Sequence, residues 1–334
     1  FCLYLIRCFY HIRFNKTEFM SHENIAFLFP GQASQYVGMG RDLYDQYPQV
    51  RVLYEQANDL LDTDIARISF DGPAETLKQT QFTQPAILIH SIAVTSILAS
   101  GGIFPDFVAG HSLGEYSALV AAKSLDVAEA VKLVRLRSEL MHQAGEDQPG
   151  TMAVFIGLSP EEAEMVCNEA STPSESVQPA NFNSPEQIAV AGSIPAVNRA
   201  MDLARAAGAK RALPISVSGA FHSVLMQSAR DGLSGAVQDA PFHDAQMPLI
   251  ANVTAQPVSK AEDIRPLLIE QLTCPVRWVE SMQTLVNLGV DTFVEVGPGS
   301  VLKGLIRRIN QDVQILNADK IESIQGVIGK LTSA

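Results

Sequence analysis

Cysteine and basic residues are scarce in this sequence of 334 residues. It has four cysteines, with no CxxC pair and no histidine cluster beside them, so it suggests neither a disulfide framework nor a zinc site. Lysine and arginine number 24 against 36 aspartates and glutamates, which gives a net charge of −12. This charge opposes nucleic-acid binding unless a strong basic cluster is present, and the chain has none of that size. A reducing cytoplasm fits this cysteine usage best.

Long apolar stretches are also missing. The best candidate, residues 86–99, is interrupted by one histidine, two serines and a threonine. It falls short of the roughly 20 apolar residues that a membrane-spanning helix needs. The hydrophobic content of 47% instead suits one large domain, or two closely packed ones, with a substantial core.

Residues 1–19 differ from the rest of the chain. They are aromatic and carry three basic residues against one acidic residue. They lack the longer apolar stretch and the small-residue cleavage site of a secretory signal. Because Met20 soon leads into a predicted strand, we expect 1–19 to be an N-terminal extension without a functional role. The alternative is a targeting arm or one that binds a membrane surface.

Strands and helices alternate along most of the chain. IAFLF at 25–29 and FVAG at 107–110 are short apolar runs of the kind found in buried parallel strands. Helical periodicity follows each of them, and the last predicted helix runs to Arg308. This alternation predicts an α/β fold with a mostly parallel sheet and helices on both faces.

The pattern changes between residues 148 and 216. Short elements follow one another there as strand, helix, strand, strand, helix and strand, which is the ferredoxin-like order. We therefore predict a catalytic core formed by 20–147 and 217–334, with a small ferredoxin-like subdomain, 148–216, inserted into it.

Ser112 lies in a nucleophile-elbow pattern. GHSLG at 110–114 fits G-x-S-x-G and falls between a predicted strand and a predicted helix. The two glycines allow a sharp turn, and the N–H groups at the helix start favour a negative charge on the reacting oxygen. The alternative is that Ser112 only caps the helix.

A serine nucleophile needs a base within hydrogen-bond reach. His111 is adjacent to Ser112, and we expect a structural role for it because neighbouring side chains at such a turn point apart. His222 lies among small residues where a loop is predicted to pass into a helix beginning at His222, so it is the preferred base. The alternative is that His222 only hydrogen-bonds the helix start. The histidines compared are His90, His111, His142, His222 and His243.

An arginine is predicted to point into the core. On the predicted helix 127–144, Arg137 falls in the middle of the apolar side. A buried guanidinium stays charged and needs a carboxylate partner, which the protein or a substrate could supply. The turns at 29–32 and 295–299 both follow predicted strands, so they could line one cleft. The alternative, which is the more common one for each turn taken singly, is a tight turn without a role in the site.

Eight segments together resemble bacterial malonyl-CoA:acyl carrier protein transacylases, in order and spacing, over about residues 24–317. The resemblance implies an α/β-hydrolase-like core with a ferredoxin-like insertion. In one departure, Ala33 stands where the family more often has glycine, which introduces strain if that position needs a positive φ. The segments are FPGQASQ (29–35), TQPAI (83–87), GHSLGEYSAL (110–119), VRLR (134–137), NFNSPEQ (181–187), GAFHS (219–223), QLTCPVRW (271–278) and EVGPGSVL (295–302).

The resemblance implies roles for the reacting groups. Ser112 would be the acylated nucleophile and His222 its base. The backbone N–H groups of Gln32 and Leu113 would form the oxyanion hole. The backbone carbonyl of Gln271 would hold the imidazole, because the family has no acidic third member of a triad.

The resemblance also implies how the substrate is bound. Arg137 would bind the free carboxylate of the malonyl group, and Asn181 would lie near the coenzyme A side of the cleft. Phe221, directly before His222, is similar to the malonyl type rather than the methylmalonyl type.

The implied activity is ping-pong transfer of a malonyl group from malonyl-CoA to the phosphopantetheine thiol of acyl carrier protein, supplying fatty acid synthesis. Malonyl-CoA and the carrier protein are expected partners, with no cofactor, metal, nucleic acid or membrane, and we expect a cytoplasmic monomer. The alternatives are a serine esterase or thioesterase, a noncatalytic acyl-binding or scaffold domain, and an acyltransferase serving a polyketide synthase.

The carrier protein of this pathway is acidic, as is this chain, so we expect docking to use a local basic patch. Lys303, Arg307 and Arg308 on the last predicted helix are one candidate group. Lys210 and Arg211 are the other.

Overall fold

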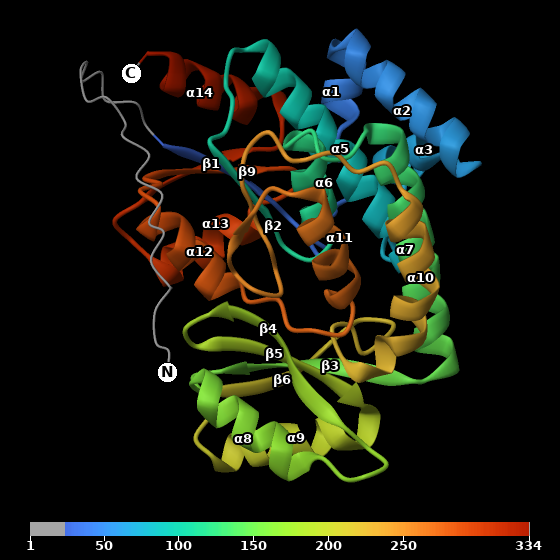
Figure 1. Ribbon diagram of the computed structural model, residues 1–334, viewed down its shortest axis with the longest axis vertical. Coiled ribbons are helices and arrows are strands. Elements are labelled where there is room, and N and C mark those ends of the chain that lie inside the picture. Colours follow the sequence, from blue (N-terminus) through green and yellow to red (C-terminus); the bar gives the residue numbers. More distant parts are fainter. Residues whose placement is uncertain (1–23, 334) are drawn as a thin grey trace, which may run out of the picture.

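The computed structural model describes residues 24–333, so the predicted extension 1–19 and Met20 lie outside the described residues. The described chain forms a larger part built on a six-stranded sheet and a smaller part built on a four-stranded sheet (Figure 1). The elements of the smaller part fall between residues 150 and 215, and those of the larger part come before and after them.

The larger sheet is parallel except at one edge, as the alternating elements predict. Only β8, the edge strand, runs antiparallel to its neighbour. The strand β10 lies at the other edge and was not expected from the sequence. In sheet order the strands are β10 (Gln314–Ala318), β9 (Thr292–Val296), β1 (Ile25–Phe29), β2 (Phe107–Gly110), β7 (Leu249–Ile250) and β8 (Pro257–Val258).

Helices cover both faces of this sheet, which explains why β1 is a continuous apolar run. Ala26 and Leu28 belong to a core shared with α12 and α13, whereas Phe27 and Phe29 belong to a core shared with α5 and α6. The helices of the larger part are α1 (Arg41–Gln46), α2 (Pro48–Leu61), α3 (Ile65–Asp71), α4 (Ala74–Leu77), α5 (Thr80–Ser100), α6 (Gly114–Ala121), α7 (Val127–Asp147), α10 (Gln227–Asp239), α11 (Ala261–Glu270), α12 (Trp278–Asn287), α13 (Val301–Ile309) and α14 (Ile321–Thr332).

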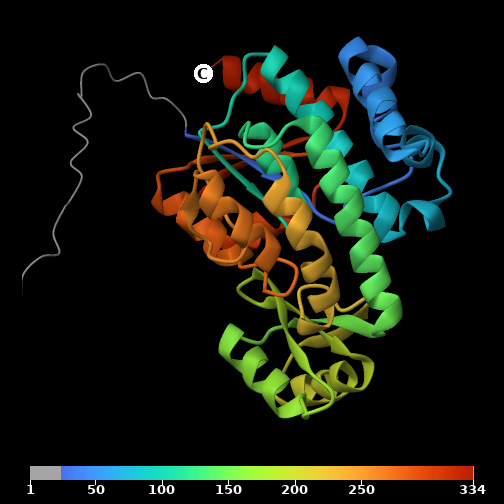
Figure 2. The ribbon, with the colours of Figure 1, turned by 45° about the vertical axis from the view of Figure 1, so that its right-hand side comes forward.

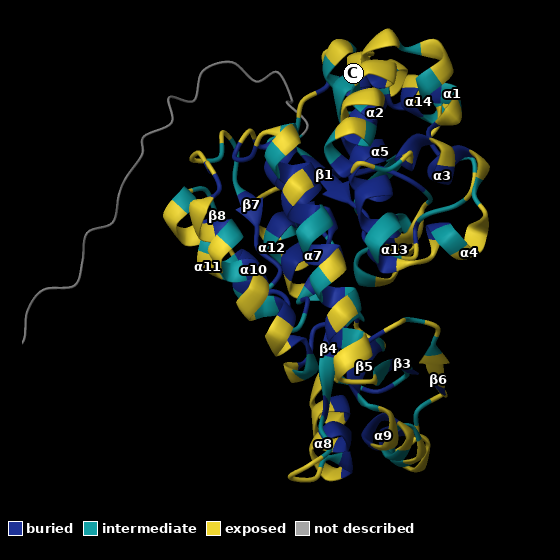
Figure 3. Ribbon diagram, turned by 90° about the vertical axis from the view of Figure 1, so that its right-hand side faces the viewer, coloured by how far each residue is buried: buried dark blue, intermediate teal, exposed yellow. Residues whose placement is uncertain are grey.

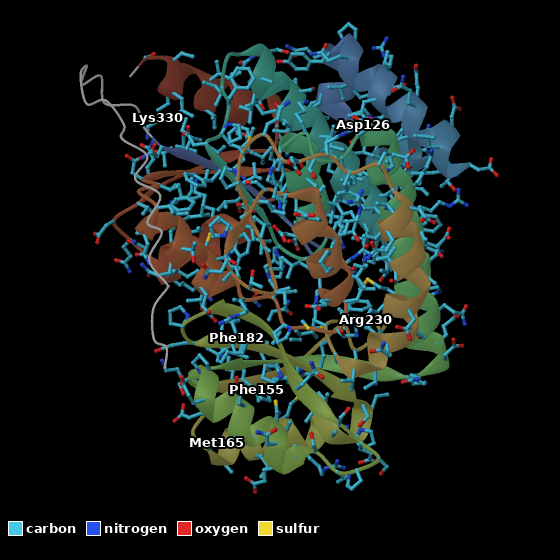
Figure 4. The ribbon with its side chains drawn as sticks, viewed as in Figure 1. Asp126, Phe155, Met165, Phe182, Arg230 and Lys330 are labelled. Carbon is cyan, nitrogen blue, oxygen red and sulfur yellow. The ribbon has the colours of Figure 1, made fainter. Side chains whose placement is uncertain are left out.

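The smaller sheet is antiparallel, with strand order β4-β5-β3-β6. Its helices α8 and α9 share a separate core with Phe155, whereas Met165 on α8 is 65% exposed at the outer end of the molecule (Figure 4). The six elements are β3 (Gly150–Ile156), α8 (Pro160–Ala170), β4 (Val177–Ser184), β5 (Gln187–Ser193), α9 (Ile194–Ala206) and β6 (Arg211–Ile215).

Two helices and the edge strand β4 of the smaller sheet join the two parts. The helix α7 runs toward the smaller part, and α10 returns beside it (Figure 2). In addition, the N–H of Phe182 donates to the carbonyl of Val276 at 2.9 Å, and the N–H of Val276 donates to the carbonyl of Ala180 at 2.9 Å. Backbone hydrogen bonds therefore tie β4 to the loop before α12.

The helix α5 supplies much of the main core. By length and composition it is the one helix among residues 24–333 that could cross a membrane, but 78% of its apolar window is buried inside the chain. Figure 3 shows this burial in dark blue. Its apolar surface therefore packs against the protein itself.

Two helix predictions were wrong. The helix expected to begin at His222 starts later, with a 3-10 turn at Val224–Met226 followed by α10. His222 has φ 59°, a left-handed conformation that cannot belong to a right-handed helix. The helix ending near Arg308 is not the last, because α14 follows β10.

Two glycines allow the turn after β2 to pack against β1. A Cβ on Gly110 would lie 1.9 Å from the carbonyl carbon of Gly114. A Cβ on Gly114 would lie 2.0 Å from the carbonyl oxygen of Phe29. Since both neighbours are backbone atoms, neither contact can be relieved by a side-chain rotation.

We expect Gly114→Ala to lower the free energy of unfolding by about 3 kcal/mol or more, because it forces β1 and α6 apart. The control is Gly326→Ala on α14, where an added Cβ meets nothing within 4 Å. That change should stabilise the protein by about 0.5–1 kcal/mol. Urea unfolding of both variants measures the difference, and equal stability of the two would contradict the packing argument.

Candidate active site

The loops that follow β1 and β2 meet at one edge of the sheet, because Phe29 and Gly110, the last residues of these strands, are paired in register. A cavity of about 250 Å³ opens at this edge. Six of the seven predicted site residues line it, and the seventh, Gln271, is fully buried. The six are Gln32, Ser112, Leu113, Arg137, Asn181 and His222.

Ser112 sits in a strained turn between β2 and α6. Its φ is 52°, in the left-handed region that an L-residue occupies at a cost of about 1–2 kcal/mol. Asn252, just after β7, holds the turn from both sides: its Oδ1 accepts from the N–H of Ser112 at 2.7 Å, and its Nδ2 donates to the carbonyl of Gly110 at 2.6 Å. The turn is therefore fixed with its hydroxyl at the cavity.

Ser112 and His222 form a hydrogen-bonded pair. The Oγ of Ser112 lies 2.8 Å from Nε2 of His222, and Nδ1 of His222 lies 2.8 Å from the backbone carbonyl oxygen of Gln271. A carbonyl can only accept, so Nδ1 carries the hydrogen and Nε2 is free to accept the hydroxyl proton. Burial, and then the charge of Arg137, lower the pKa of His222 to about 3, so the imidazole is neutral near pH 7.

Arg137 is fully buried at the floor of the same cavity, as the helical periodicity predicts. Its Nη1 donates to Oε1 of Gln84 at 2.8 Å, and its Nη2 donates to Oε1 of Gln271 at 2.8 Å and to Oγ of Ser112 at 3.1 Å. All three acceptors are neutral, and no carboxylate among the described residues forms an ion pair with it. The internal salt bridge, one of the two alternatives, is therefore absent from this part of the chain.

Two backbone donors face the cavity beside Ser112. The N–H groups of Gln32 and Leu113 make no hydrogen bond to another described residue. The side chain of Gln32 donates from Nε2 to Oγ1 of Thr80 at 3.3 Å, which fixes its loop. Next to it, Ala33 has φ 82°, so the strain expected for an alanine at this position is present.

His111 and Asn181 occupy the side of the cavity toward the small sheet. Nε2 of His111 lies 2.8 Å from Oδ1 of Asn183, and its ring packs 5.3 Å from that of Trp278. His111 is therefore turned away from Ser112, as expected. Asn181 is buried on β4 and lines the cavity.

The turn at 295–299 does not line the cavity, so of the two alternatives for this segment the tight turn is the one found. Gly297 packs against Pro30, and Gly299 packs against the backbone of Ser34, so this turn supports the first loop from behind. The following helix, α13, contributes Val301, Leu302 and Leu305 to the cavity wall instead.

Sequence reasoning missed three residues of the site. Gln84, Glu115 and Asn252 are all buried and hydrogen-bonded to the groups around Ser112. Burial raises the pKa of Glu115 to about 7, against the opposing hydrogen bonds from Gln271 and Asn252. A usable signal was present for both amides: Gln84 directly precedes the apolar helix that the sequence predicts from residue 85, and Asn252 is the last residue of the strand that it predicts at 248–252.

Residues 26–331 match the family model of the acyl transferase domain. The malonyl CoA-acyl carrier protein transacylase of Bacillus subtilis (strain 168) is 44% identical over 307 residues, which cover 92% of this chain and 97% of that protein. The chain belongs to the malonyl CoA-acyl carrier protein transacylase family.

Solved structures of this transacylase family agree closely with the fold. The malonyl CoA-acyl carrier protein transacylase of Coxiella burnetii aligns with a TM-score of 0.90 at 41% identity, covering 93% of this chain and 98% of that one. A malonyl-transacylase solved in complex with its type II PKS acyl-carrier protein aligns with a TM-score of 0.89 at 40% identity, covering 92% and 99%.

We expect His222 to show no titration between about pH 5 and pH 8, because burial and the Arg137 charge lower its pKa. Removing the cation with Arg137→Met should raise this pKa toward the usual value. NMR titration of the imidazole signals measures the pKa of His222 in the wild-type protein and in Arg137→Met. The His222 signal is identified as the one that is missing in His222→Gln. A wild-type pKa near the ordinary 6.5 would contradict this description of the site.

Proposed function

We propose that this chain transfers a malonyl group from malonyl-CoA to the phosphopantetheine thiol of acyl carrier protein, supplying fatty acid synthesis. One observation carries the proposal: a buried guanidinium, in contact only with neutral acceptors, donates a hydrogen bond to the hydroxyl that is paired with His222. A substrate that bears both an acyl carbonyl and a free carboxylate fits these two groups at once. The names of the relatives agree with this substrate.

The first half-reaction forms an ester on Ser112. Its Oγ attacks the thioester carbonyl while Nε2 of His222 takes the hydroxyl proton, over the 2.8 Å that separates them. The N–H groups of Gln32 and Leu113 donate to the oxyanion of the tetrahedral intermediate. The carbon–sulfur bond then breaks, and coenzyme A leaves as a thiol with the proton from His222.

The second half-reaction reverses these steps. The phosphopantetheine thiol of the carrier gives its proton to His222 and attacks the malonyl ester, and Ser112 recovers the proton when the ester bond breaks. Gln271 keeps the imidazole in the required tautomer throughout, because its carbonyl accepts from Nδ1. No group of three or more metal-ligating side chains occurs among residues 24–333, and this mechanism assigns no step to a cofactor.

Arg137 provides the selectivity for malonyl over uncharged acyl groups. Removing one partner of a buried ion pair costs about 3–5 kcal/mol. That corresponds to a preference of about a hundredfold or more in rate for malonyl over acetyl. Asn181, on the side of the small sheet, is placed to contact the coenzyme A side of the substrate.

The carrier docks over the second cavity, next to the first. This depression of about 740 Å³ is lined by Lys210 just before β6, by Arg211 at the start of β6 and by Arg308 from α13, so it combines residues of both candidate groups. It also contains Glu186, which pairs with Lys210 at 2.8 Å, so Arg211 and Arg308 carry its excess positive charge. Gln187 lines both cavities and accepts from Nη1 of Arg308 at 2.7 Å. A basic surface that adjoins the catalytic cavity suits an acidic carrier whose arm must reach Ser112.

The proposed organisation is an α/β-hydrolase-like core, 20–147 and 217–334, with a ferredoxin-like subdomain, 148–216. The strand–turn–helix around Ser112 supports the α/β-hydrolase-like core. The strand order β4-β5-β3-β6 supports the ferredoxin-like subdomain. The proposed form is a monomer, since one chain supplies every group that the mechanism uses. A cytoplasmic location without nucleic acid or membrane is proposed from the cysteine usage, from the net charge of −12 and from the burial of α5.

A carrier from polyketide synthesis is the second candidate partner. A specific observation favours it: one structural neighbour, at 40% identity, is a malonyl-transacylase in complex with a type II PKS acyl-carrier protein. The chemistry at Ser112 would be the same. A serine esterase or thioesterase needs no inward arginine, and a noncatalytic acyl-binding domain needs no serine–histidine pair.

Brief incubation with malonyl-CoA, without carrier, should place a malonyl group on Ser112, and added holo carrier protein should discharge it. Arg137→Ala should slow malonyl loading about a hundredfold or more, with a much smaller effect on acetyl-CoA. Intact mass measures how fast the malonyl and acetyl adducts form and are discharged, and peptide mapping locates them. Ser112→Ala serves as the unreactive variant. Lys132→Ala, exposed on the same helix and paired with Glu129, is the matched control and should load normally.

Two outcomes would overturn this function. Steady release of coenzyme A without an adduct, and without carrier, would indicate a hydrolase. Equal loading of malonyl and acetyl groups by the wild-type protein would show that Arg137 does not select the malonyl carboxylate, and the observation that carries the proposed function would be lost.

The double change Arg211→Ala and Arg308→Ala should raise the KM for carrier protein about three- to tenfold and reduce its dependence on salt. Malonyl loading of Ser112 at saturating malonyl-CoA should change much less. The control is Lys260→Ala, a surface lysine paired with Asp244 and remote from both cavities. An unchanged KM for carrier in the double variant would exclude this docking surface.

A further inference from the structure

Glu115 is a buried carboxylate that the mechanism above leaves without a role. It lies in the first turn of α6, three residues after Ser112, and is 2% exposed. Its Oε2 accepts from Nε2 of Gln271, and its Oε1 accepts from the N–H of Asn252 at 3.3 Å. Both partners also contact Ser112, so the carboxylate lies behind the reactive turn and outside the lining of the cavity.

The carboxylate decides how the amide of Gln271 is oriented. Both hydrogens of Nε2 are used, one by Glu115 and one by the carbonyl oxygen of Ser112 at 3.0 Å. The amide oxygen is thereby turned toward Nη2 of Arg137, 2.8 Å away. A flipped amide would set its oxygen against two acceptors and its NH₂ group against a cation, so only one orientation satisfies all partners.

The interposed amide also keeps the carboxylate from contacting Arg137 directly. Glu115 acts on the guanidinium through space, but the atom that touches Arg137 is a neutral oxygen. A direct ion pair would occupy the guanidinium with an internal carboxylate. The relay through Gln271 holds Arg137 in place and leaves its charge available to a substrate.

We propose that Glu115 is a positioning residue for acyl selectivity, which through Gln271 holds the guanidinium of Arg137 against Ser112. The proposal rests on the proposed function. The backbone of Gln271 is fixed separately from its side chain, because its N–H donates to the carbonyl of Leu267 at 3.0 Å at the end of α11. The contact between Gln271 and Nδ1 of His222 therefore does not depend on Glu115.

The test is Glu115→Gln, which keeps the size of the side chain. The new NH₂ group must face either Nε2 of Gln271 or the N–H of Asn252, and both of these are donors. We expect kcat/KM for malonyl transfer to fall at least tenfold, mainly through KM, while acetyl transfer falls much less. In the Arg137→Ala background the same change should have little further effect on malonyl transfer, because the residue that it positions is gone. The matched control is Glu139→Gln on the exposed face of α7, which should keep both rates.

Equal loss of malonyl and acetyl transfer in Glu115→Gln, or full additivity with Arg137→Ala, would overturn the proposal, since either result means a general structural role. If Glu115→Gln does not fold, Gln271→Leu breaks the same relay from its other end and should give the same selective loss. Unchanged selectivity in that variant would also overturn it.

A second readout separates this proposal from the proposed function. If the wild-type protein forms no malonyl adduct, the proposed function has failed, but the position of Arg137 is still measurable from its effect on His222. In Glu115→Gln the guanidinium is released, so the pKa of His222 should rise from its low value. An unchanged His222 pKa would show that Arg137 has not moved and would overturn the proposal.

Discussion

The guanidinium of Arg137 is completely buried, no carboxylate among residues 24–333 forms an ion pair with it, and much of the site is organised around that charge. A buried cation loses its hydration, so its donors must be met by well-placed acceptors. Gln84 from α5 and Gln271 after α11 accept from its Nη atoms, whereas its Nε has no hydrogen-bond partner among the described residues. The ring of Tyr116 lies 5.7 Å from the guanidinium carbon. Side chains from α5, from α6 and from the residue that ends α11 thus meet around one charge.

The same charge shapes the chemistry of the serine–histidine pair. Together with burial it keeps His222 neutral, and a neutral imidazole is the form that can accept the proton of Ser112. A base with a strongly lowered pKa is weak, so in the proposed mechanism the N–H groups of Gln32 and Leu113 must stabilise the negative charge that develops. The absence of a carboxylate on Nδ1 is consistent with this balance, because a backbone carbonyl fixes the tautomer without raising basicity as strongly.

Much of this arrangement was visible in the sequence, because it depends on local patterns. The G-x-S-x-G turn predicts the strand, the glycines and the exposed hydroxyl, and helical periodicity alone predicts that Arg137 points inward. The partners of these residues were not predictable, since Gln84 lies 53 residues from Arg137, and Gln271 lies 134 residues from it. Such contacts depend on how the elements pack. The late start of α10 was missed for a similar reason, because the left-handed conformation of His222 is imposed by its contacts with Ser112 and Gln271.

The backbone bonds between β4 and Val276 limit how the two parts can move. They join the small sheet to the segment that begins with Gln271 and passes into α12, so the two walls of the cavity are linked by main-chain hydrogen bonds as well as by α7 and α10. A hinged closure of the small part over the large one would have to break them. The part of the cavity wall that Asn181 contributes from β4 is therefore held to the larger part by main-chain hydrogen bonds, and not only by side-chain packing.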